Sequence, residues 1–99
     1  MTKDIDTVLR VVAEQFAVSV AEIRSHRRSR QVVPARLVAA YLAHEVTERS
    51  PQDIGRQLGG RDQTNIVMYC RTIARRAAED QEFNGLVRSL EGRIRSRAD

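Results

Sequence analysis

Apolar residues recur at helical spacing in several stretches of this 99-residue chain, and no stretch of useful length alternates like a strand. The first of these stretches predicts an amphipathic helix from about residue 4 to residue 17. Ser19, followed three positions later by Glu22, has the form of a capping box and predicts a short second helix through Ile23. The pattern therefore favours an all-α protein.

The next segment, residues 24–31, is rich in arginine and has no apolar periodicity, so it is predicted to be a loop. A third helix is expected to start near Val33-Pro34, because proline is tolerated in a first helical turn. It should run to about Glu48. Its core residues would be Leu37, Val38, Tyr41, Leu42 and Val46.

Two short sequence motifs predict where a fourth helix begins and ends. Ser50 is suited to cap a fourth helix, with Pro51 at the first helical position and Asp53 closing a second capping box. The pair Gly59-Gly60 predicts that this helix ends in a left-handed C-cap, since glycine adopts positive φ without steric cost.

Asp62 is placed to cap a fifth helix. Its buried stripe would consist of Ile66, Tyr69, Cys70, Ile73 and Ala77. A last helix, from about residue 82 to residue 96, would bury Phe83, Leu86, Val87, Leu90 and Ile94. The predicted architecture is a compact all-α domain of five or six helices, with residues 1–99 forming one domain.

The fourth and fifth helices, joined by the glycine pair, have the spacing of a helix-turn-helix, whose second helix enters the DNA major groove. The face of the fifth helix opposite its buried stripe presents Asp62, Gln63, Thr64, Asn65 and Met68. Gln and Asn can bond adenine, Asp can accept from cytosine, and Thr and Met can touch a thymine methyl group. Asp62 has two roles open to it, a base contact and a plain helix cap. Arg61, just before the helix, can reach phosphate or guanine.

The charge is concentrated in the middle of the chain. The formal net charge is +4, but residues 24–76 carry eleven arginines against four acids, and both flanks are slightly acidic. Within residues 24–36 there are five arginines and no acid, an arrangement that is costly to gather without an anion. We therefore expect DNA phosphate to be bound near Arg27, Arg28, Arg30 and Arg36.

These features add up to a family resemblance. The stretches RSHRRSRQVVPAR, AAYLAHEVTERSPQDIGRQLGGRDQT and CRTI contain paired arginines, an S-x-x-x-I-G segment and GGRD, in order and at matching intervals. Over roughly residues 5–77 the chain resembles the C-terminal DNA-binding domain (domain IV) of the bacterial DnaA replication initiators; residues 78–99 would form the C-terminal helix. That family reads a short box of double-stranded DNA through both grooves.

The resemblance implies residue roles. By position, Arg28 corresponds to the arginine that enters the minor groove and Arg36 to a phosphate contact. Recognition falls to Arg61, Asp62, Gln63 and Thr64. The chain departs from the family where His-Thr-Thr usually follows the aspartate, because it has Gln63-Thr64-Asn65 there, and His44 replaces a common basic residue. We expect these departures to change the DNA sequence that is preferred.

Other classes of function have little support. There is no G-x-x-x-x-G-K-[ST] loop for nucleotide phosphates, and no nucleophile–base pair, so no ATPase activity or other catalysis is expected. His26 and His44 have no partners at metal-ligand spacing, and no cofactor is predicted. The single cysteine, Cys70, suits a reducing compartment, and no apolar run could cross a membrane. The expected location is the cytoplasm, in association with the nucleoid.

Two hypotheses about function remain. The first is a sequence-specific double-stranded DNA-binding protein acting in replication initiation control or transcription. The second is an adaptor for a protein of the replication machinery, bound through the C-terminal helix, with DNA binding secondary. The second hypothesis predicts that deleting residues 82–99 abolishes the complex and leaves the fold of residues 5–77 largely intact.

Overall fold

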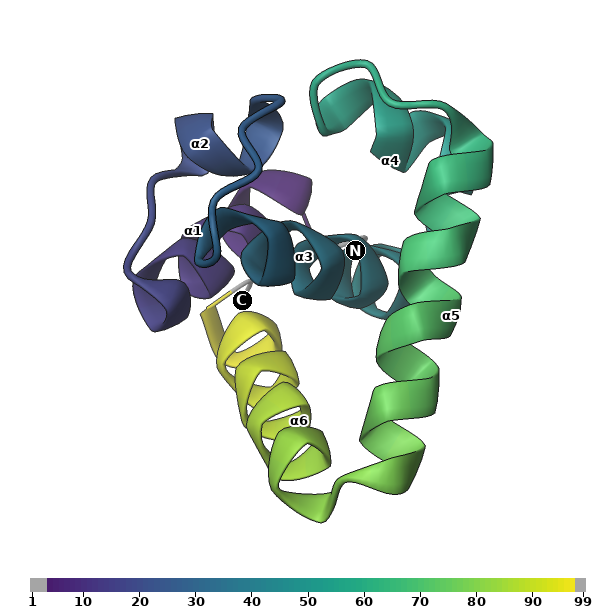
Figure 1. Cartoon of the computed structure of the whole chain (residues 1–99). Coiled ribbons are helices and arrows are strands. Elements are labelled where there is room, and N and C mark those ends of the chain that lie inside the picture. The colour runs from purple at the N-terminus through teal and green to yellow at the C-terminus, as the bar shows by residue number, and fades with distance from the viewer. Residues whose placement is uncertain (1–3, 98–99) are drawn as a thin grey trace.

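The structure is a computed structural model, and it describes residues 4–97. This part of the chain contains helices and no strands (Figure 1). The helices are α1 (Ile5–Phe16), α2 (Val20–Arg24), α3 (Val32–Thr47), α4 (Pro51–Gln57), α5 (Gln63–Glu79) and α6 (Gln81–Arg97). The all-α prediction is confirmed, with six helices in the described residues.

Helix α3 lies at the centre of the molecule and contacts each of the other five helices (Figure 1). Its sequence explains this position, because apolar residues surround most of the helix and leave little polar surface to face water. Among its buried residues are Val38, Ala39, Leu42 and Val46. Helices α1, α5 and α6 pack their apolar stripes around it.

Most of the predicted helix ends are confirmed. The Ser19 hydroxyl accepts a bond from the Glu22 N–H at 3.0 Å, and the Glu22 carboxylate accepts one from the Ser19 N–H at 2.9 Å, which completes the capping box of α2. At α4 the second capping box is only half formed. The Ser50 hydroxyl accepts from the Asp53 N–H at 3.2 Å, but the Asp53 carboxylate pairs with Arg49 at 2.8 Å instead of turning back to Ser50.

Helix α6 is an integral part of the core. Phe83, Val87, Leu90 and Ile94 are buried in the same cluster as residues of α1 and α3. In Figure 1, α5 and α6 form a hairpin, and α6 returns toward α1 and α3. This packing argues against the expectation that residues 5–77 keep their fold without residues 82–99, because that deletion would expose the apolar residues that α6 covers.

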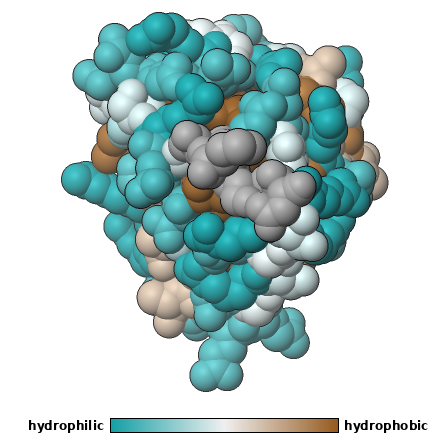
Figure 2. All heavy atoms as spheres, turned by 180° about the vertical axis from the view of Figure 1, so that it is seen from behind, coloured by the Kyte–Doolittle hydropathy of each residue, from teal (hydrophilic) through white to brown (hydrophobic). Residues whose placement is uncertain are grey.

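The face seen from behind is mostly hydrophilic, with hydrophobic residues visible only in small separate areas (Figure 2). Among the described residues no helix is long and apolar enough to span a bilayer. Residues 4–97 also contain no group of three His, Cys, Asp or Glu side chains placed to hold a metal ion.

Candidate nucleic-acid interface

The segment from α4 to α5 forms a helix–turn–helix, and local chemistry explains its geometry. After α4 the chain turns through Gly59 and Gly60, which have φ of +78° and +77°. Both values lie in the left-handed region that favours glycine, as the sequence predicted. The Asp62 carboxylate then accepts a bond from the Thr64 N–H at 3.2 Å, so the capping role of Asp62 is confirmed.

The first turn of α5 presents its polar side chains to solvent. Asp62, Gln63, Thr64 and Asn65 are all exposed, whereas the next residue, Ile66, is completely buried. The buried isoleucine anchors the helix and leaves the four preceding side chains free to meet a ligand. Predicted core positions farther along behave as expected, with Ile73 buried and Tyr69, Cys70 and Ala77 packed against the core.

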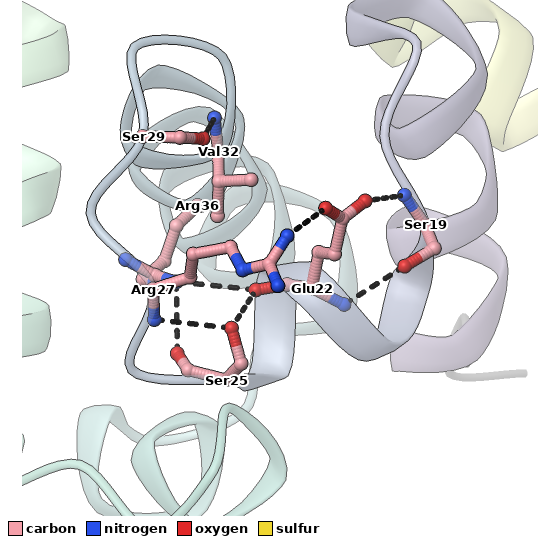
Figure 3. Close-up of polar contacts among 7 residues, drawn as sticks. All are labelled: Ser19, Glu22, Ser25, Arg27, Ser29, Val32 and Arg36. Carbon is pink, nitrogen blue, oxygen red and sulfur yellow. Dashed lines mark hydrogen bonds and ion pairs between the residues drawn. The ribbon is translucent and has the colours of Figure 1, made fainter.

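Residues 25–31, called the basic loop from here on, connect α2 to α3. Arg28 and Arg30 are exposed and make no hydrogen bond or ion pair with any described residue. Arg27 is also exposed, but it pairs with Glu22 at 3.1 Å (Figure 3). The loop is tied to the helix that follows it, because the Ser29 hydroxyl accepts a bond from the Val32 N–H at 3.2 Å (Figure 3).

Arg36 occupies a different environment from the loop arginines, because only 3% of its surface is exposed. Its guanidinium donates to backbone carbonyls, through Nε to Ile23 at 2.9 Å. Its Nη2 donates to the carbonyls of Glu22 at 3.2 Å and Ser25 at 2.8 Å (Figure 3). Burial lowers the pKa of this guanidinium, and the positive charge of Arg61 lowers it further. The family resemblance implied that Arg36 contacts phosphate. In the structure, however, the hydrogen bonds of Arg36 are to backbone carbonyls of the protein itself.

Arg61 is likewise bonded to backbone. Its guanidinium donates to the carbonyls of Leu58 and Ser25, the latter at 2.6 Å, and more distantly to that of Arg24 at 3.5 Å. Arg36 and Arg61 thus donate to the same oxygen, that of Ser25. Neither guanidinium pairs with a carboxylate among the described residues, so their positive charges are not neutralised.

A cleft of about 480 Å³ separates the basic loop from the start of α5. Arg28 lines it from the loop, Arg36 from α3, and Arg61, Asp62 and Asn65 from the turn and α5. The structure therefore brings five of the predicted site residues around one concave surface. Arg27, Arg30, Gln63 and Thr64 lie outside the lining of this cleft, on the exposed loop and the exposed first turn of α5.

Other exposed residues lie farther along α5; the sequence indicated Met68 as a contact for a thymine methyl group but did not single out Arg71 or Arg75. Met68 is 57% exposed, and it is the one large hydrophobic side chain that is exposed among the described residues. Arg71 and Arg75 follow it on α5 at spacings of three and four residues, are exposed, and make no hydrogen bond or ion pair within residues 4–97. The sequence signal that could have identified Arg71 and Arg75 is their spacing, which places them on one helical face with Met68. This face adds positive charge beyond the polar first turn of α5.

Comparison with known proteins agrees with this geometry. The family model described as the bacterial DnaA protein helix-turn-helix matches residues 5–73. A chromosomal replication initiator protein DnaA from Chloroflexus aurantiacus is 39% identical over 89 residues, which are 90% of this chain and 19% of that protein. The corresponding protein from Bradyrhizobium sp. is 41% identical over 90 residues, 91% of this chain and 19% of its own length.

A solved structure points the same way. The crystal structure of a DNA replication initiation factor superposes with a TM-score of 0.84 at 26% identity, covering 96% of this chain and 30% of the other. The chain thus spans about a fifth of the length of the curated relatives it matches. What is shared is the helical unit that contains the helix-turn-helix.

Proposed function

Because the chain belongs to the bacterial DnaA helix-turn-helix family, we propose that it is a sequence-specific double-stranded DNA-binding protein acting in replication initiation control or transcription. One observation carries the proposal. The basic loop and the first turn of α5 line the same cleft, so a loop arginine and base-reading side chains face a ligand together. The proposed action needs no nucleotide and no catalytic step.

In the proposed complex the N-terminus of α5 enters the major groove. Gln63 and Asn65 carry amides that can bond adenine bidentately, and Thr64 can contact a thymine methyl group. Asp62 already accepts a backbone hydrogen bond, and its carboxylate can in addition accept from a cytosine amino group. Exposure of all four side chains supports this assignment.

The basic loop supplies the second contact. Arg28 is exposed, has no protein partner and lines the cleft, which supports its assignment to the minor groove. Arg30 and Arg27 are placed to meet phosphates, although Arg27 must first release Glu22. Arg36 contributes through its charge at the wall of the cleft, where burial reduces screening by water.

The DNA sequence recognised should differ from the usual box of the family. Gln63 and Asn65 stand where the family usually has histidine and threonine, and a changed base contact is worth about 1–3 kcal/mol. Substituting either residue should therefore alter the preferred bases more than the overall affinity.

The adaptor function is less well supported. One face of α6 is used for the core, and the arginines on its remaining surface are paired with glutamates. A partner would have to bind over arginines that already have a glutamate partner, and the visible surface has no broad apolar patch to attract one (Figure 2).

Selection from a random duplex library tests the proposal directly. We expect one asymmetric motif to be enriched, with an affinity that falls steeply as salt concentration rises. The Arg97→Ala variant is a matched control, because it removes an arginine that does not line the cleft and pairs with Glu14 of α1. Enrichment of no motif by the wild-type protein would overturn the proposal.

A further inference from the structure

The environment of Arg61 separates it from the base-reading side chains that follow it. Although it immediately precedes Asp62, its guanidinium does not extend into solvent alongside them. It bridges the chain instead, donating to Leu58 at the end of α4 and to Ser25 at the start of the basic loop. The side chain of Arg61 thus reaches a loop residue, Ser25, that lies 36 residues earlier in the sequence.

The same junction is reinforced by a second set of contacts. The Nε atom of Arg24 donates to the Gln57 carbonyl at 3.1 Å, which adds another bond between the two segments. Gly59 lies so close to the Arg24 carbonyl that a Cβ atom there would overlap the oxygen. Backbone and side chains therefore hold the base of the loop against the turn of the helix-turn-helix.

From these contacts we propose that Arg61 is a positioning residue, which fixes the basic loop relative to the first turn of α5 so that Arg28 and residues 62–65 engage their two grooves together. The inference rests on the proposed function and refines it, because it removes Arg61 from the residues that read bases.

The physical basis is pre-organisation. An untethered loop would lose conformational freedom when Arg28 entered the minor groove, and that loss would weaken binding. A loop that is already fixed at its base presents Arg28 at a high effective concentration once α5 is in the major groove. Lysine could not replace the arginine here, since a single ammonium group lacks the planar fork that spans two carbonyls on different segments.

The test compares Arg61→Met and Arg61→Lys with the wild-type chain. The Ser25 carbonyl keeps its bond from Arg36 in both variants, and the core is untouched, so the fold should be retained. In the free protein, we expect hydrogen exchange of the amides of residues 26–31 to become about tenfold faster in both variants. Unchanged exchange in these amides would overturn the proposal, whether or not the protein binds a specific duplex.

Binding supplies the second part of the test. We expect either variant to lose about tenfold in affinity for the selected duplex while keeping its preference at each base pair read by residues 62–65. In the Arg28→Ala background the same substitution should cost less than threefold, because a positioned loop matters only when Arg28 is present.

A base-reading or phosphate-binding Arg61 would behave differently. The Met variant would then lose preference at one base pair or lose affinity additively with Arg28→Ala, and the Lys variant would retain much of the binding. Either result would overturn the positioning role. Failure of the wild-type protein to enrich any duplex would instead refute the proposed function, and the exchange measurement would still decide whether Arg61 holds the loop.

Discussion

Arg93 and Arg97 of α6 both reach Glu14 of α1, at 3.1 and 3.0 Å, whereas Arg28 and Arg30 of the basic loop contact no carboxylate among the described residues. Both regions are rich in arginine, and both lie at the surface. At the α6 end each arginine is paired with a glutamate, and Glu14 and Glu91 each serve two arginines. At the cleft the charges are either left exposed or bonded to uncharged carbonyls.

The two regions differ in how their arginines are used, either paired at the surface or left with their charge available to a ligand. Paired surface charges add little to stability, and a glutamate that serves two arginines reduces their field at a polyanion without cancelling it. Unpaired guanidinium groups keep their field, and the cleft gathers Arg28, Arg36 and Arg61 around one concave surface. We therefore expect loss of the apolar face of α6 to affect folding, loss of its paired arginines to have little effect, and changes at the cleft to affect DNA binding. Arg36, which is buried at the wall of the cleft, should contribute to both folding and binding.

The largest expected effect is at the α6 end. Deleting residues 81–99 removes four buried apolar side chains of α6, each worth about 1.5–3 kcal/mol, from a fold whose whole stability is expected to be about 5–15 kcal/mol. We expect no cooperative unfolding transition, measured by circular dichroism during urea titration. The Arg93→Ala/Arg97→Ala double variant is the control, since it keeps the apolar face. A truncated chain that unfolds cooperatively would show that α6 is dispensable.

The next effect concerns Arg36, a residue of the cleft whose bonds to buried carbonyls also stabilise the fold. Arg36→Met leaves the buried carbonyl of Ile23 without its donor and should lower the free energy of unfolding by about 3 kcal/mol. The measurement is the urea midpoint at constant m-value. Arg28→Met is the matched control and should stay within about 0.5 kcal/mol of wild type, because Arg28 is exposed and unpartnered. If Arg36→Met lowered the free energy of unfolding by less than about 1 kcal/mol, the carbonyls bonded by Arg36 would be hydrogen-bonded to water in the variant.

The ends of the helices could be predicted from the sequence, whereas the roles of Arg36 and Arg61 could not. The helix ends were predictable because the signals are local, as with Ser19 and Glu22 at α2 and the glycine pair after α4. The roles of Arg36 and Arg61 were not, because arginines are alike in sequence and only the folded chain brings carbonyls from residues 22–25 to them. Asp53 illustrates the same limit, since the neighbouring Arg49 takes the carboxylate that a capping box would use.

At the cleft, Arg28→Ala should reduce affinity for the selected duplex by about tenfold or more and lower the slope of log K against log salt by about 1. The cause is the loss of a positive charge that has no protein partner to replace it. Fluorescence anisotropy at several salt concentrations measures both quantities. Arg97→Ala should change neither, and equal losses in the two variants would show that only overall charge matters.

The smallest expected effect is at Glu91, which pairs with Arg88 at 2.6 Å and with Arg95 at 2.9 Å. Hydrogen bonds from Arg95 and Arg88 lower the pKa of this carboxyl below its ordinary value of 4.5. Its contribution to stability is therefore complete above that value and is lost as the pH falls through the lower folded-state pKa.

The Glu91→Gln variant should accordingly lower the free energy of unfolding by less than about 1 kcal/mol at pH 7, because the pairs lie near the surface. The difference from wild type should shrink as the pH falls below 4.5, since the wild-type carboxyl is then protonated too. Urea midpoints between pH 7 and pH 3 measure this, and duplex affinity at pH 7 should remain unchanged. A loss of DNA binding in this variant would break the proposed separation, because it would place a determinant of binding at the α6 end.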